Sequence, residues 1–197
     1  MNRRTFMGTS LVAVGSGTML LEGCTFGGVI AEIKAYIPIG IAAFNGVVTL
    51  LTGLGIIPPG TSTLLALLIA AVKGGFADII AAIDAYNNAP AADKTTLLQK
   101  ISLILSEISA NIGKFFADLN ISNSSVLTLV TGLVQLILST LAGFASQLPA
   151  PPTPVALSAR VAGHPIVITP KILSRSEFKA QWNKTVTTAG HPELVLT

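Results

Sequence analysis

The sequence has few residues of the kinds that carry charge or form cross-links. Cys24 is its only cysteine, so no disulfide forms within the chain. Charged residues make up 11% of the 197 residues, and the formal net charge is only +3. A charge this small and scattered does not indicate a nucleic-acid partner. Stability must therefore come from an apolar core.

Catalytic motifs are also lacking. The sequence contains no Gly-x-Ser-x-Gly elbow and no glycine-rich phosphate loop of the Walker or dinucleotide type. Its two histidines, His164 and His191, each precede a proline, and a metal site built from them and Glu193 is a weaker hypothesis than two loop histidines without a catalytic role. Asp78 and Asp84 lie six residues apart, on different faces of a predicted helix. We therefore predict that the protein is not an enzyme and has no catalytic, cofactor-binding or metal-binding residues.

Hydrophobic residues, in contrast, make up 51% of the chain, and its mean hydropathy is +0.72. They form four runs in which apolar residues recur every three or four positions, which predicts helices. Pro38 is expected to bend or break the first helix. Thr61 or Ser62 is expected to cap the second helix, and Ser122 or Ser124 the fourth. The predicted helices cover about residues 27–54, 62–86, 93–119 and 126–148.

The third run is the clearest helix, because its apolar stripe is flanked by charged residues on the other faces. Long helices joined by short connections are antiparallel neighbours. The predicted fold is therefore all-α, an antiparallel four-helix bundle over residues 24–148.

Residues 149–158 form a proline-rich linker, which is stiff and extended. The tail at residues 159–197 is basic, with five basic and two acidic residues. Ser174 and Glu177 have the spacing of a capping box, which predicts a short helix through Phe178 and Trp182 that packs against the bundle. Short strands are expected at residues 166–169 and 194–196, and these two segments are candidates for pairing with each other.

The N-terminus has the three parts of a secretory signal: a charged start, an apolar middle and a small-residue end. Arg3 and Arg4, followed by Thr5, Phe6 and Met7, resemble the twin-arginine translocation signal of bacteria. The apolar middle is diluted by glycine, serine and threonine, as is usual for that class of signal. Residues 1–23 are therefore interpreted as a signal peptide.

The signal ends in residues that resemble a bacterial lipobox. Leu21, Gly23 and Cys24 match its pattern, and Glu22 departs from it, because that position is normally small and uncharged. The resemblance implies a lipoprotein whose Cys24 carries a diacylglycerol. Two or more acyl chains give stable anchoring, so the expected location is the periplasmic side of a membrane in the cell envelope.

Two long segments without charge, residues 35–72 and 119–159, raise the question of membrane spans. The fourth run keeps a polar stripe that suits a wet face, made of Ser124, Thr128, Thr131, Gln135 and Ser139. The twin-arginine resemblance implies a protein that folds before export, which favours a bundle outside the membrane.

Two functional hypotheses follow from this composition. The first is a membrane-anchored, non-catalytic interaction or scaffold module, whose partners are membrane lipid, through acylated Cys24, and an envelope protein. The alternative is a carrier of an apolar ligand or lipid, or a helical protein that inserts into the membrane. Neither hypothesis involves nucleic acid.

Overall fold

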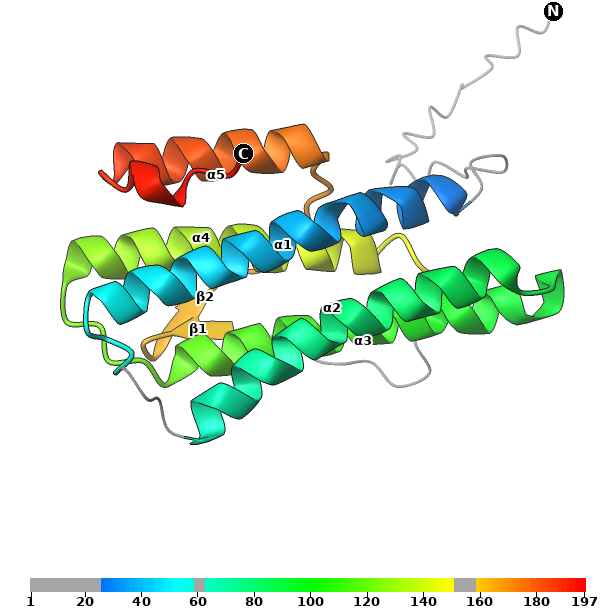
Figure 1. Ribbon diagram of the computed structural model, residues 1–197, viewed down its shortest axis with the longest axis horizontal. Coiled ribbons are helices and arrows are strands. Elements are labelled where there is room, and N and C mark those ends of the chain that lie inside the picture. Colours follow the sequence, from blue (N-terminus) through cyan, green and yellow to red (C-terminus); the bar gives the residue numbers. More distant parts are fainter. Residues whose placement is uncertain (1–25, 59–62, 151–158) are drawn as a thin grey trace, which may run out of the picture.

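The structure, a computed structural model, describes residues 26–58, 63–150 and 159–197 (Figure 1). Consecutive long helices run in opposite directions, which confirms the predicted antiparallel bundle (Figure 1). A fifth, shorter helix lies against α1 and α4, on the side away from α2 and α3 (Figure 1). The elements are α1 (Gly27–Gly53), α2 (Thr63–Asn88), α3 (Ala91–Ala117), α4 (Ser124–Ala145), β1 (Ala159–Val161), β2 (His164–Ile166), α5 (Arg175–Thr188) and the 3-10 helix η1 (Pro192–Leu194).

Two local predictions about the helices need correction. Helix α1 does not break at Pro38, because the residues on either side, Ile37 and Ile39, are buried in the core and hold the helix together; a bend at Pro38 stays a prediction. Helix α4 is capped by Asn123 rather than by Ser122 or Ser124. The Asn123 side-chain oxygen accepts hydrogen bonds from the backbone N–H groups of the second and third residues after it, at 3.0 and 3.1 Å. The candidate caps Thr61 and Ser62 lie outside the described residues.

One apolar core runs through the bundle and includes side chains of the tail. Phe115 of α3 packs edge-to-face against Phe44 of α1 and Phe116, with ring centroids 5.7 and 4.8 Å apart. In α5, Phe178 and Trp182 are fully buried. Their packing against the bundle was predicted and is confirmed, as is the capping box between Ser174 and Glu177. The two hydrogen bonds from Ser174 lower the pKa of the Glu177 carboxyl.

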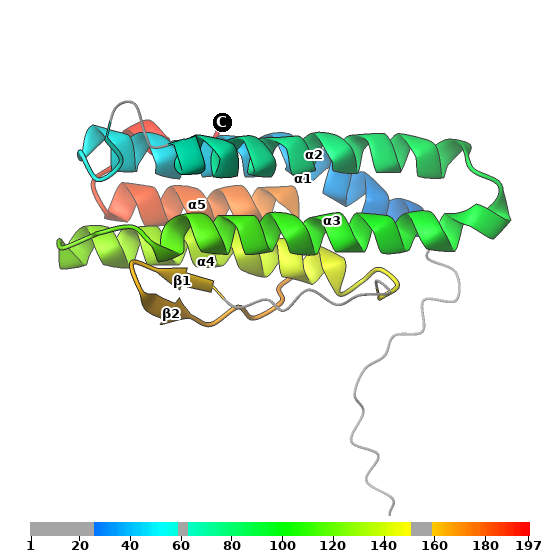
Figure 2. The same cartoon turned by 90° about the horizontal axis from the view of Figure 1, so that it is seen from below.

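The β1–β2 hairpin caps the C-terminal end of α3, a function that the sequence did not suggest (Figure 2). The N–H groups of Ala162 and Gly163, in the hairpin turn, donate to the carbonyls of Phe116 and Ala117, each at 2.9 Å. These carbonyls lie in the last turn of α3, where helical partners are missing. The hairpin therefore satisfies two backbone acceptors of the bundle.

The predicted strands of the tail are wrong in position and pairing. β2 ends at Ile166 and pairs with β1, whereas the segment expected to form the second strand contains part of η1. After Ile166 the backbone turns to α4: the carbonyl of Val167 accepts from Gln135, and the N–H of Lys171 donates to the carbonyl of Ser139, both at 2.9 Å. The backbone of this segment therefore forms hydrogen bonds with helix α4 instead of extending the β1–β2 sheet.

These contacts also change the interpretation of the polar stripe on α4. Ser124 and Thr128 are exposed, as expected for a wet face, but Ser139 is buried and Gln135 is half-buried. The C-terminal half of the stripe lies beneath residues 167–171, so it docks the tail instead of facing solvent.

We expect Ala162→Gly to stabilise the protein by up to about 1 kcal/mol, because Ala162 adopts a φ of +49°, a conformation that costs a residue with a Cβ about 1–2 kcal/mol. Gly163, the next turn residue, has a φ of +78°, and no atom lies within 4 Å of the place where its Cβ would stand. Backbone strain alone therefore makes Gly163→Ala destabilising, by a similar amount. Urea unfolding of the two variants checks this pair; shifts of the same sign would contradict it.

Candidate functional site

The residues predicted to direct export and anchoring, Arg3, Arg4, Phe6 and Cys24, lie outside the described residues. The two histidines are found in different elements: His164 begins β2, and His191 precedes η1. His191 Nδ1 lies 2.8 Å from the Glu193 carboxylate. Within the described ranges, no group of three His, Cys, Asp or Glu side chains is placed to hold a metal ion.

Helix α2 is very apolar but poorly covered. Its most apolar stretch has a mean hydropathy of 2.0, and only 28% of that stretch is buried, compared with 50% in α1 and 61% in α4. By length and composition all three helices are suited to crossing a membrane. The inner side of α2, with Val72, Phe76 and Ile79, is fully buried. The apolar surplus therefore lies on the outer side.

The outer face of α2 is a stripe of mostly small residues, with the exposed Ile80, Lys73 and Asp78 beside it. It is defined here as Leu67, Ala70, Gly74, Ala77, Ala81 and Ala85, all of them exposed. These residues recur every three or four positions and so form one stripe along the helix. Leu67 is the one large side chain among them, with 61% of its surface exposed. The result is an uncharged stripe of mostly small side chains on α2, a helix that lies at the edge of the bundle (Figure 1).

Charges flank the outer face of α2. Lys34 of α1 forms an ion pair with Asp84, with 3.0 Å between the amino nitrogen and the carboxylate oxygen. Both side chains are about half exposed, so the pair contributes little to stability. Lys73 and Asp78 are also exposed on α2. The pair connects α1 to α2 at the surface. The sequence did not predict this pair, because Lys34 and Asp84 are far apart along the chain.

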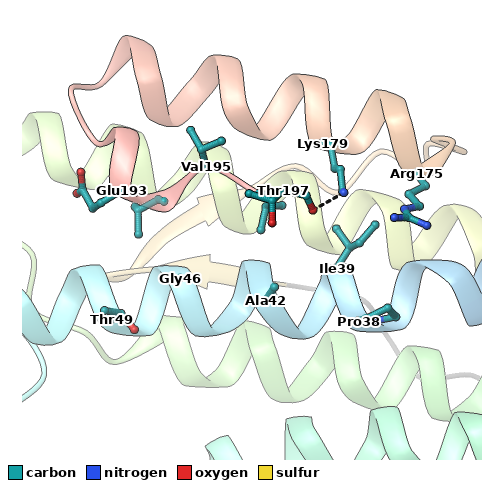
Figure 3. A pocket seen from close by; sticks show the side chains of 12 residues that line it. Pro38, Ile39, Ala42, Gly46, Thr49, Arg175, Lys179, Glu193, Val195 and Thr197 are labelled. Carbon is teal, nitrogen blue, oxygen red and sulfur yellow. Dashed lines mark hydrogen bonds between the residues drawn. The ribbon is translucent and has the colours of Figure 1, made fainter.

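A groove separates α1 from the tail (Figure 3). This α1–α5 groove has a volume of about 480 Å³ and is lined on one side by α1 and on the other by α5 and residues 193–197. Arg175 and Lys179 lie toward one end and Glu193 toward the other (Figure 3). Lys179 donates a hydrogen bond to the backbone oxygen of Thr197.

Small residues on α1 make this groove hollow. Ala42 and Gly46, four residues apart on α1, lie on the same face of the helix and line the groove. Trp182 of α5 lies next to Gly46: its ring atom Cζ2 is 3.6 Å from where a Cβ on Gly46 would stand, and its Nε1 donates to the carbonyl of Leu194 at 2.8 Å. The α5 helix and its aromatic residues were predicted from the sequence, but the groove was not, because its two sides are far apart in the chain.

One buried polar group has no partner. The hydroxyl of Tyr36 makes no hydrogen bond within the described part of the chain. Its ring lies edge-to-face against Phe144 of α4 and Phe178 of α5, with centroids 5.4 and 5.1 Å apart. Burial raises the pKa of this hydroxyl. Tyr36 therefore joins three helices as a packing residue.

No protein-family model, no curated protein and no solved structure matches this sequence.

Proposed function

We propose that this protein is an exported helical lipoprotein, anchored to a membrane through an acylated Cys24, that serves as a non-catalytic interaction module of the cell envelope. The observation that carries the proposal is the outer face of α2, an apolar helix surface left open by the bundle. Its occupant is an envelope protein that contributes a helix. The N-terminal signal supports the location, and the folded bundle presents the binding face.

Small side chains favour a helix as the occupant of this face. Ala70, Gly74, Ala77 and Ala81 let the backbone of a second helix come close along the whole stripe, so that many weak van der Waals contacts add up. A bare stripe of alanine contributes little to binding a bilayer surface, because each buried methylene is worth only about 0.8 kcal/mol. The geometry therefore favours close helix packing over lipid.

Membrane insertion of α2 is the competing function, and the charges on α2 weigh against it. In a span, Lys73, Asp78 and Asp84 would together cost about 7 kcal/mol or more, whereas the Leu, Ile, Val and Phe residues of the helix would gain about 5 kcal/mol in total. Inserting α1 or α4 would also remove buried side chains such as Phe44 and Leu133 from the core. Binding of a protein at the bundle surface neither buries these charges in a bilayer nor disrupts the core.

Site-specific photo-crosslinking in the native cell tests the α2 face. A photoreactive residue at Ala77 is expected to yield an adduct with one envelope protein, and Ala81→Glu in the same chain is expected to abolish it. The matched control is Ala92, an exposed alanine at the start of α3, which is expected to yield no such adduct. Adducts with lipid alone at Ala77, or equal adducts at both positions, would refute binding through α2.

The anchor is tested separately. We expect Cys24→Ser to release the protein from the membrane fraction and to remove the mass of the lipid, because the cysteine thiol is the group that accepts the lipid in a lipobox. Replacing both Arg3 and Arg4 with lysine is expected to leave an unprocessed precursor in the cytoplasm. Cell fractionation and mass spectrometry measure both outcomes. A Cys24→Ser variant that stays in the membrane fraction with no loss of lipid mass would show that lipidation at Cys24 is wrong.

A further inference from the structure

We infer that the α1–α5 groove binds a single-chain amphiphile with an anionic head group, such as a fatty acid. This site is separate from the outer face of α2, and the inference does not depend on the partner proposed there. It rests on three features of the groove: its small-residue floor, the position of its cations, and its size.

The floor suits one acyl chain. Ala42 and Gly46 leave a channel along α1, and Ile39 and Val195 supply apolar walls. Along α1 the lining runs from Pro38 to Thr49, which is about 16 Å of helix. The volume of about 480 Å³ lies within the range of small-molecule sites. A medium-length chain lying along the channel would contact Ile39 on α1 and Val195 on the tail.

The charged residues at the ends of the groove determine the orientation of the bound amphiphile. Arg175 lies at one end of the groove and forms no ion pair within the part of the chain that the structure describes. Lys179, one turn further along α5, lies at the same end, where it donates to the backbone oxygen of Thr197 (Figure 3). A guanidinium group offers two parallel N–H donors to a carboxylate or a phosphate. The head group would therefore lie at Arg175, with the chain running toward Gly46.

Glu193 reinforces this orientation. Its carboxylate lines the opposite end of the groove and lies 2.8 Å from His191 Nδ1. An anionic head group placed there would meet a like charge, which disfavours the reversed orientation. A groove with cations at one end, a carboxylate at the other and apolar residues such as Ile39 and Val195 between them matches an amphiphile better than an uncharged oil.

Trp182 provides a direct readout of binding. It is the only tryptophan in the chain, and its buried ring lies next to Gly46, which lines the groove. Titrating the full chain with dodecanoate below its critical micelle concentration is expected to change Trp182 fluorescence in a saturable way, with one ligand per chain. Dodecyl phosphate tests whether the site takes a phosphate head group as well as a carboxylate. Dodecanol, which has the same chain without the charge, is expected to bind at least tenfold more weakly.

Variants test separately the cation proposed to bind the head group and the channel proposed to hold the acyl chain. Arg175→Gln is expected to weaken dodecanoate binding about tenfold, equivalent to about 1.4 kcal/mol, and to leave dodecanol unchanged. Ala42→Leu fills the channel at an exposed position and is expected to abolish binding of both. Lys184→Gln removes a cation of the same helix outside the groove and serves as the control. Absence of a saturable signal, or equal affinity in the parent, Arg175→Gln and Ala42→Leu proteins, would overturn the proposal.

Discussion

Replacing Trp182 with alanine is expected to lower the free energy of unfolding by about 3–5 kcal/mol. The indole is fully buried, stacks on Phe178 with ring centroids 6.1 Å apart, and donates to the carbonyl of Leu194. Truncation leaves a cavity and removes the hydrogen-bond donor of that carbonyl. Helix α5 has 14 residues, too few to be stable without tertiary packing. We therefore expect α5 to become susceptible to proteolysis.

The measurement is urea unfolding followed by far-ultraviolet circular dichroism, because the substitution removes the fluorophore. Trp182→Phe is the matched control: it keeps most of the apolar volume but loses the hydrogen bond, so a smaller loss of about 1–2 kcal/mol is expected. An alanine variant within about 1 kcal/mol of the parent protein would show that α5 does not depend on this anchor.

Gly143→Ala is expected to destabilise the protein by about 2–4 kcal/mol. A Cβ at this position would lie 2.3 Å from the backbone oxygen of Lys171, which is far inside van der Waals contact. The backbone of the tail would have to move away from α4, breaking the 2.9 Å hydrogen bond from the N–H of Lys171 to the carbonyl of Ser139. Urea unfolding monitored by Trp182 fluorescence gives the change in stability.

Another glycine of α4 provides the control. No atom lies within 4 Å of a Cβ placed on Gly132, and alanine is favoured over glycine in a helix by up to about 1 kcal/mol. Gly132→Ala is therefore expected to stabilise the protein, whereas Gly143→Ala destabilises it. If the two variants shift stability in the same direction, close contact between α4 and the tail does not explain the glycine at position 143.

Local patterns were sufficient for much of the fold. The four long helices follow from apolar residues repeating every three or four positions, and the start of α5 follows from Ser174 and Glu177, because a capping box involves residues only three apart. Asn123 was missed as a cap because three neighbouring residues, Ser122, Asn123 and Ser124, are all good caps. Only the backbone geometry decides which one ends the turn.

The tail shows where local patterns fail. Residues 166–169 have the composition of a strand, yet the carbonyl of Val167 bonds to Gln135 of α4. β-propensity reports mainly whether a side chain fits a half-buried extended segment, so it cannot name the backbone partner. The same limit applies to the polar stripe on α4, whose Ser139 is polar but covered by the tail.

The candidate sites show the same contrast between what local sequence predicts and what tertiary packing decides. The sequence alone, through its apolar periodicity and its lack of known motifs, indicated a helical protein with a large apolar core and no recognisable catalytic motif, and the N-terminal residues suggested the export signal and Cys24 as the anchor. Periodicity shows that α2 is a helix, but it cannot show which side the other helices cover. Only the packing reveals that its small residues are left exposed. Gly46 and Arg175 likewise line one groove although they are far apart in the sequence. Only the tertiary structure decides this, because the packing of α1 against the tail, not local sequence, brings the two sides of the groove together.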